Sequence, residues 1–208
     1  MNKPTHVMGG ITAGIAVNKF VVPTLTNVAS IEGVIGIVAV MAGAFLGSVL
    51  PDIDHRGSFI GRRLRIISTP FAIAGFASKQ VKKVANTVTG KKGSTDTIIS
   101  HRGITHTLIF AIGLCTLLSY LVLQLSGFSQ AIMLFFVLGL FGGILSHLVL
   151  DMLTKSGVPL LYPFTKRDFS FAPFETGGVG EYIASFGCIA LIVLMLQDSP
   201  GILMTFIE

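Results

Sequence analysis

Five long apolar runs constrain what this chain can fold into more than any other feature. They cover about residues 5–22, 31–50, 104–125, 131–153 and 181–196. A helix needs roughly 20 apolar residues to cross the hydrocarbon core of a bilayer, so each run is close to the required length. Only 12% of the residues are charged, whereas soluble domains carry roughly 25%. The pattern predicts an all-α, polytopic membrane bundle with about five transmembrane helices, in a single domain of residues 1–208.

Small residues and a proline shape the second apolar run. Pro51 has no backbone N–H and its ring clashes with the preceding turn, so the helix is expected to stop there. Small side chains recur within the run and allow another helix to approach closely; they are Gly36, Ala39, Gly43 and Gly47.

Most of the positive charge lies between the second and third runs. Ten of the fifteen Lys and Arg residues fall between Asp52 and Gly103, and residues 56–100 are expected to form a basic loop. Residues 66–77 within it are apolar but contain Pro70 and are too short to span, which indicates an interfacial or re-entrant piece. Residues 79–97 are polar and basic.

The basic residues also predict the orientation. Lys and Arg favour the cytoplasmic side of a membrane, which places residues 56–100, residues 154–180 and the N-terminus in the cytoplasm. The net charge of +5 is then explained by topology and by attraction to anionic lipid head groups. A nucleic-acid partner is not expected, and no oligomeric state follows from the sequence.

All five histidines fall at one side of the membrane in this topology. Near them lie three aspartates, and the two loops on the opposite side have no histidine. The side chains that we expect to hold a metal are His6, Asp52, Asp54, His55, His101, His106, His147 and Asp151. Burying such groups near hydrocarbon costs several kcal/mol unless they are paired or bound to metal.

The local spacings of these residues suit metal binding. His147 and Asp151 are four residues apart, so they lie on one face of a helix. The segment from Asp52 to His55 presents two carboxylates and an imidazole within a short turn. Each piece alone has an ordinary structural explanation, such as a hydrogen-bonded pair or a helix-end turn. Their gathering at one membrane face is what indicates a site.

Mixed imidazole and carboxylate ligands suit a divalent transition metal, expected to be one or two Zn²⁺, with Mn²⁺ or Fe²⁺ as alternatives. Eight candidate ligands exceed the four of one tetrahedral ion, so a centre of two metal ions that activates water is possible. Some of the eight residues could instead form hydrogen bonds to the ligands and orient them. Cys115 and Cys188 lie inside apolar runs without metal-binding spacing. The H-E-x-x-H motif of zinc proteases is missing.

Two residues are expected to act directly in catalysis. Arg102 lies between two predicted ligands and suits a phosphate or a developing oxyanion, although it also fits the general excess of cytoplasmic charge. Asp54 is the expected proton acceptor. Glu181 opens the last apolar run, where a carboxylate favours the helix dipole, so a capping role is preferred to catalysis.

The chain resembles the YdjM-like family of small bacterial inner-membrane proteins, described as predicted metal-dependent hydrolases. The resemblance is carried by His6 with Gly9 and Gly10, by residues 47–55 (GSVLPDIDH), by residues 101–107 (HRGITHT) and by residues 143–154 (GILSHLVLDMLT). It implies a multi-pass protein of the bacterial inner membrane that hydrolyses a substrate with the help of metal. It supplies no substrate.

Together these features predict a membrane-embedded, metal-dependent hydrolase at the cytoplasmic interface. A membrane lipid is the expected substrate, through a phosphoester or diphosphate, because Arg102 and the basic loop attract phosphate. Two alternatives stay open: a protein that binds or transports divalent metal, and a membrane-anchored regulatory partner that uses the basic loop.

Overall fold

The computed structural model describes residues 1–28, 30–54, 104–125, 127–165, 167–172 and 174–197. Within these ranges the chain is helical, and its only β contacts are two isolated bridges in the loop before the last helix. The elements are α1 (Lys3–Phe20), α2 (Val22–Leu25), α3 (Ile31–Val49), η1 (Pro51–Asp54), η2 (Ile104–His106), α6 (Leu108–Val122), α7 (Phe128–Met152) and α8 (Val179–Gln197). The predicted all-α class is confirmed.

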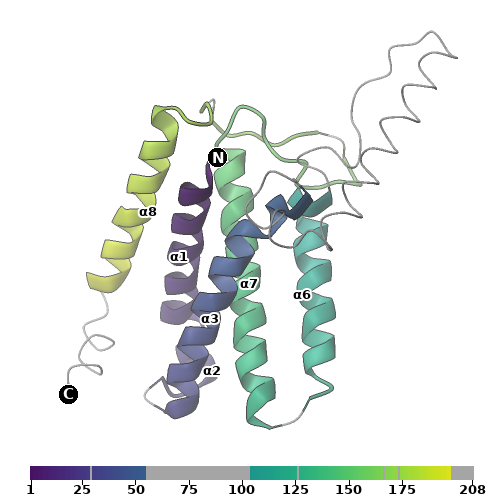
Figure 1. The fold of residues 1–208 in the computed structure, drawn as a ribbon, viewed down its shortest axis with the longest axis vertical. Helices are drawn as coiled ribbons and strands as arrows, with labels where there is room; N and C mark the ends of the chain where they lie inside the picture. Colours follow the sequence, from purple (N-terminus) through teal and green to yellow (C-terminus); the bar gives the residue numbers. More distant parts are fainter. Residues whose placement is uncertain (29, 55–103, 126, 166, 173, 198–208) are drawn as a thin grey trace, which may run out of the picture.

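Four apolar stretches in the described part of the chain are long enough to cross a membrane: Lys3–Leu25, Ile31–Val49, Gln130–Met152 and Val179–Gln197. The expected third span is shorter than predicted. Thr107 caps α6 by accepting a hydrogen bond from the backbone N–H of Phe110, and residues Ile104–His106 form a separate 3-10 turn. The 15 residues of α6 extend about 22 Å, yet the helix still lies alongside α7 (Figure 1).

The contact between α3 and α7 is the most extensive between any two described helices. A Cβ at Gly43 would overlap the carbonyl oxygen of Phe136, and one at Gly47 would overlap that of Leu140. Gly139 and Gly143 of α7 meet the α3 backbone in the same way. Two facing pairs of glycines four residues apart therefore bring the helix backbones together, as the small residues of α3 predicted.

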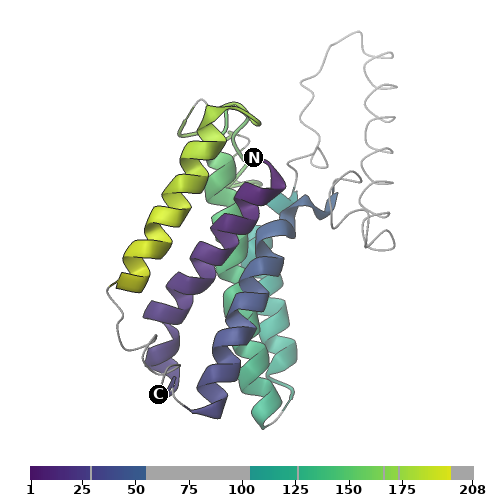
Figure 2. The same ribbon diagram turned by 60° about the vertical axis from the view of Figure 1, so that its left-hand side comes forward.

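The remaining helices pack around this pair. Helix α1 contacts both α3 and α7, α8 contacts α1, and α6 contacts α7. Figures 1 and 2 show α8 at the outer edge of the bundle beside α1. Large apolar side chains on α8, including Tyr182, Phe186 and Leu194, are exposed. An exposed apolar face of this kind suits contact with lipid.

One end of the bundle gathers the chain segments that carry the predicted ligands. The first turn of α1, the turns η1 and η2, and the last turns of α7 all lie there, while α2 and the turn between α6 and α7 lie at the opposite end (Figure 1). The interfacial piece at 66–77 and the loop at 79–97 fall outside the described residues.

Candidate metal centre

Four segments that are distant in the sequence supply one cluster of histidines and aspartates. His6 comes from α1, Asp52 from η1 and His106 from η2, whereas His147 and Asp151 come from α7. The three histidines and Asp151 are at most 2% exposed. Such deep burial of charged and polar side chains requires partners or an ion.

Local structure positions each of these side chains. Leu50 is the C-cap of α3, and Pro51 then begins η1, which carries Asp52. The capping of α6 by Thr107 leaves His106 in the turn just before the helix. His147 and Asp151 lie on one face of α7, as their spacing predicted.

Two imidazoles face each other at the middle of the cluster. The Nε2 atoms of His106 and His147 are 3.3 Å apart. An Asp52 oxygen lies 3.6 Å from the Nε2 of His106 and 3.8 Å from that of His147, and Asp151 Oδ2 lies 3.8 Å from both. Ligands that share one tetrahedral Zn²⁺ at about 2.0–2.2 Å lie about 3.3–3.6 Å apart. Donor atoms of Asp52, His106 and His147 all lie within 4.8 Å of one another, close enough for these side chains to share an ion.

Hydrogen bonds orient these two rings. His147 Nδ1 lies 2.7 Å from the carbonyl oxygen of Ser48, an atom that only accepts, so Nδ1 carries a proton. In a neutral ring, Nε2 then presents a lone pair to the cluster. His106 Nδ1 lies 3.2 Å from the hydroxyl of Thr105. Backbone carbonyls and hydroxyls fix metal-binding histidines in this way in known sites.

His6 forms a second group of donors with His147 and Asp151. Its ring stacks on that of His147 with centroids 3.8 Å apart. Its Nε2 lies 3.4 Å from Asp151 Oδ1, the oxygen that also contacts the amino group of Met1 at 2.6 Å. The two oxygens of Asp151 thus face different partners. Donor atoms of each group, His6/His147/Asp151 and Asp52/His106/His147, lie within 4.8 Å of one another.

Asp52 is the most accessible of these side chains, with 29% of its surface exposed. Burial by itself would raise the pKa of Asp52, but a hydrogen bond with His106 and the electrostatic effect of the neighbouring histidines lower it to about 2. Asp52 is therefore a carboxylate at neutral pH and suits a cation.

Some predicted site residues are not placed by the structure. The backbone of Asp54 belongs to η1, beside Asp52. His55, His101 and Arg102 lie outside the described residues. Five of the eight predicted ligands are brought together, and the other three stay predictions.

Glu181 contributes to the architecture of the site and not to the cluster itself. Its carboxylate accepts hydrogen bonds from the backbone N–H of Gly177, just before α8, and from the backbone and side-chain amides of Asn2. The capping role was predicted. The link to Asn2 was not, because nothing in the sequence connects residues 179 positions apart.

Known proteins match the chain over most of its length. The family model described as YdjM inner membrane protein matches residues 1–206. Inner membrane protein YdjM of Escherichia coli (strain K12) and that of Shigella flexneri are each 35% identical over 154 residues, which is 74% of this chain. The match covers 63% of those relatives, less than two thirds of their length.

A Bacillus subtilis (strain 168) protein, Uncharacterized protein YvsG, is 28% identical over 187 residues, 90% of this chain and 89% of that relative. No solved structure matches the chain. The family match covers nearly every residue, and the helices of the described part are long and apolar enough for a membrane. The chain therefore belongs to the YdjM inner membrane protein family.

Proposed function

We propose that this protein is a membrane-embedded, metal-dependent hydrolase that cleaves a phosphoester or diphosphate of a lipid. One observation carries the metal site: the facing Nε2 atoms of His106 and His147, with carboxylate oxygens of Asp52 and Asp151 within 3.8 Å of both. The Nε2 lone pair of His147 and the two carboxylates favour a bound cation at this point.

The donor set suits Zn²⁺, with Mn²⁺ or Fe²⁺ as alternatives, because it contains imidazole and carboxylate without thiolate. His106, His147, Asp52 and Asp151 would hold the first ion. A second ion would take His6 and the other oxygen of Asp151. In this arrangement Asp151 would contribute one oxygen to each ion.

Bound metal would lower the pKa of water toward neutrality and polarise the phosphoryl oxygen. The protein supplies the rest. The bond from His147 Nδ1 to Ser48 holds the ring so that Nε2 faces the centre. Asp54, next to the cluster in the chain, would accept the proton of the attacking water, and Arg102 would bind the phosphate. In a lipid monophosphate, water would add to phosphorus, the P–O bond to the lipid would break, and the alkoxide would take the proton held by Asp54 and leave as the alcohol. In a lipid diphosphate the P–O–P bond would break instead, and the lipid monophosphate would leave.

The position of the cluster favours an enzyme over a transporter. The candidate ligands lie at one end of the bundle, where the head group of a membrane lipid would also lie, and Asp52 is the most exposed of them. A transport site would be expected near the middle of the membrane with a polar path on both sides.

The test combines metal content with turnover. Detergent-purified protein and the variant His106→Ala would be compared by mass spectrometry of bound metal and by phosphate release from phosphatidic acid and from a polyprenyl diphosphate. We expect transition metal and phosphate release in the wild type and loss of both in the variant. Metal without release from either lipid would contradict the hydrolase, and wild type that holds no metal after reconstitution would contradict the centre itself.

A further inference from the structure

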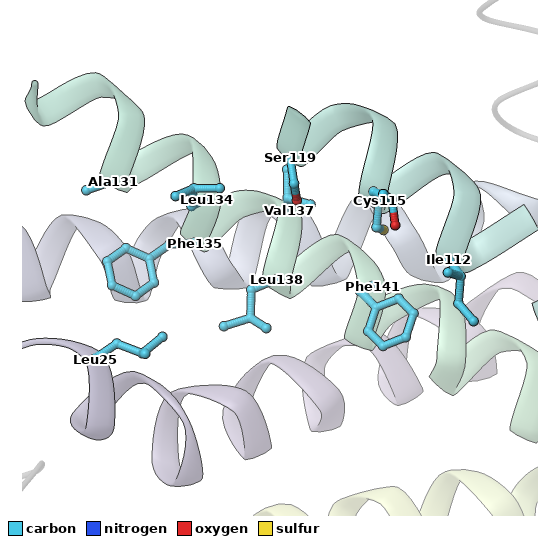
Figure 3. A pocket seen from close by; sticks show the side chains of 11 residues that line it. Leu25, Ile112, Cys115, Ser119, Ala131, Leu134, Phe135, Val137, Leu138 and Phe141 are labelled. Carbon is cyan, nitrogen blue, oxygen red and sulfur yellow. The ribbon is translucent and has the colours of Figure 1, made fainter. Parts of the chain in front are cut away.

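An apolar groove of about 680 Å³ lies along the side of the bundle, away from the histidine cluster. Its floor is α7, one wall is α6, and Leu25 of α2 closes its far end (Figure 3). Its size falls within the roughly 300–1,000 Å³ of ordinary ligand pockets. None of the described residues that line it is charged.

The groove opens toward the lipid. Leu25 and Ile112 at its two ends are 62% and 49% exposed, and α7, its floor, is one of the membrane-spanning helices. Whatever fills the groove in a membrane must therefore be apolar and must come from the bilayer.

The groove also lies along the two segments that carry the facing imidazoles. Its near end is formed by Ile112 of α6 and Phe141 of α7 (Figure 3). Phe141 lies six residues before His147, about 9 Å along α7, and Ile112 lies six residues after His106, which precedes α6 in the turn η2. The two sides of the groove are thus the two segments that carry the facing imidazoles.

The depth of the groove agrees with that of a lipid chain. From Phe141 to Ala131, the groove runs about 9 to 24 Å below the level of His147. Head-group layers are about 5–7 Å thick on each side and one leaflet of hydrocarbon is about 15 Å thick. A lipid with its phosphate at the histidines would therefore place its chain at this depth.

We propose that the groove between α6 and α7 binds a hydrocarbon chain of the phospholipid whose phosphate lies at the metal centre. The proposal rests on the proposed function for the position of the phosphate, and it names the substrate class: a lipid with a terminal phosphate and a long chain. The groove selects for the chain, and the centre selects for the head group.

The chain contains no tryptophan, so single tryptophans can report which lipid contacts the groove. Leu138→Trp places one on the floor, and Ser119→Trp places one on the α6 wall. Leu194→Trp on α8 is the matched control. Asp151 and Glu181 contact the adjacent residues Met1 and Asn2, so they lie at one level. Leu138 and Leu194 are each 13 residues from that level and thus at similar depth.

The experiment measures quenching of each tryptophan in phosphatidylcholine vesicles, using phosphatidic acid with brominated acyl chains as the probe. We expect quenching of the two groove tryptophans to saturate at low mole fraction and the control to respond only to bulk lipid content. Brominated phosphatidylcholine should quench all three positions alike. Equal curves for phosphatidic acid at groove and control would overturn the proposal, as would groove quenching that does not distinguish the two head groups.

This outcome is independent of turnover. Selective quenching without any phosphate release would keep the groove and contradict the hydrolase. Phosphate release without selective quenching would support the hydrolase and contradict the groove as the site of the lipid chain.

Discussion

His147 joins the two groups of donor atoms in the cluster. Its ring stacks on His6, its Nε2 faces His106, and its Nδ1 is held by the carbonyl of Ser48. His6 contributes to only one group, through Asp151 Oδ1. Asp151 contacts His6 through Oδ1 and lies 3.8 Å from His106 and His147 through Oδ2. The loss of His6 and the loss of Asp151 are therefore expected to remove different numbers of ions.

The variant His6→Ala should retain about one equivalent of metal where the wild type binds about two, because the donors of the first ion stay in place. Asp151→Ala should lose both, since Asp151 Oδ1 faces His6 and Oδ2 faces His106 and His147, so each proposed ion loses a ligand. Metal content by mass spectrometry, with thermal unfolding as a check of folding, distinguishes the two variants. Identical stoichiometry in both variants, or a single ion in the wild type, would refute the two-ion arrangement.

The gathering of His6, Asp52, His106, His147 and Asp151 could be predicted from the sequence, because histidines are rare in the chain and the expected topology places all of them near one membrane face. The sequence could not predict how they divide into two groups. That division depends on the angle between η1, η2 and α7, which no local spacing encodes. The hydrogen bond from His147 to the carbonyl oxygen of Ser48 could not be predicted either, because every residue has a backbone carbonyl and the residue type does not indicate which one is used.

At the scale of the helices, the contact between α3 and α7 determines the geometry of the site. Helix α3 leads into η1 with Asp52, and α7 carries His147 and Asp151. Side chains at the glycine positions would separate these helices and move the two carboxylates apart.

The substitution Gly43→Ala tests this contact. The added Cβ would overlap the carbonyl oxygen of Phe136, and overpacking of this kind costs about 1–3 kcal/mol. Gly113→Ala on α6 is the matched control, because its Cβ would meet nothing within 4 Å. The control should be neutral or more stable by about 0.5–1 kcal/mol, since alanine favours helix. Thermal unfolding in detergent measures both, and equal stability of the two variants would contradict the close contact.

Four of the five predicted helices have about the expected length, because apolar composition over 20 residues depends on the membrane and not on tertiary detail. The boundaries differ by a few residues. The main exception is α6, where apolar Ile104 extended the predicted helix across a 3-10 turn. The capping hydroxyl of Thr107 was the signal that could have placed the start correctly.

At the scale of the whole molecule, the prediction concerns orientation. The candidate metal centre and the N-terminus lie at the same end of the bundle, and the distribution of Lys and Arg predicts that this end faces the cytoplasm. Single cysteines would be introduced at Gln124 and at Asp168, both exposed and at opposite ends, in a chain with Cys115 and Cys188 replaced by serine. In intact cells with a permeable outer envelope, a membrane-impermeant maleimide should label Gln124→Cys and spare Asp168→Cys. The reverse pattern would place the centre on the outer side.

The cluster draws on residues that are made at very different times. His6 leaves the ribosome about 145 residues before Asp151, which at roughly 5–20 residues per second is a delay on the order of ten seconds. During that interval His6 is already made but Asp151, its partner in one of the two groups of donors, is not. An ion held by both residues, as proposed above, could therefore bind only after α7 has been made.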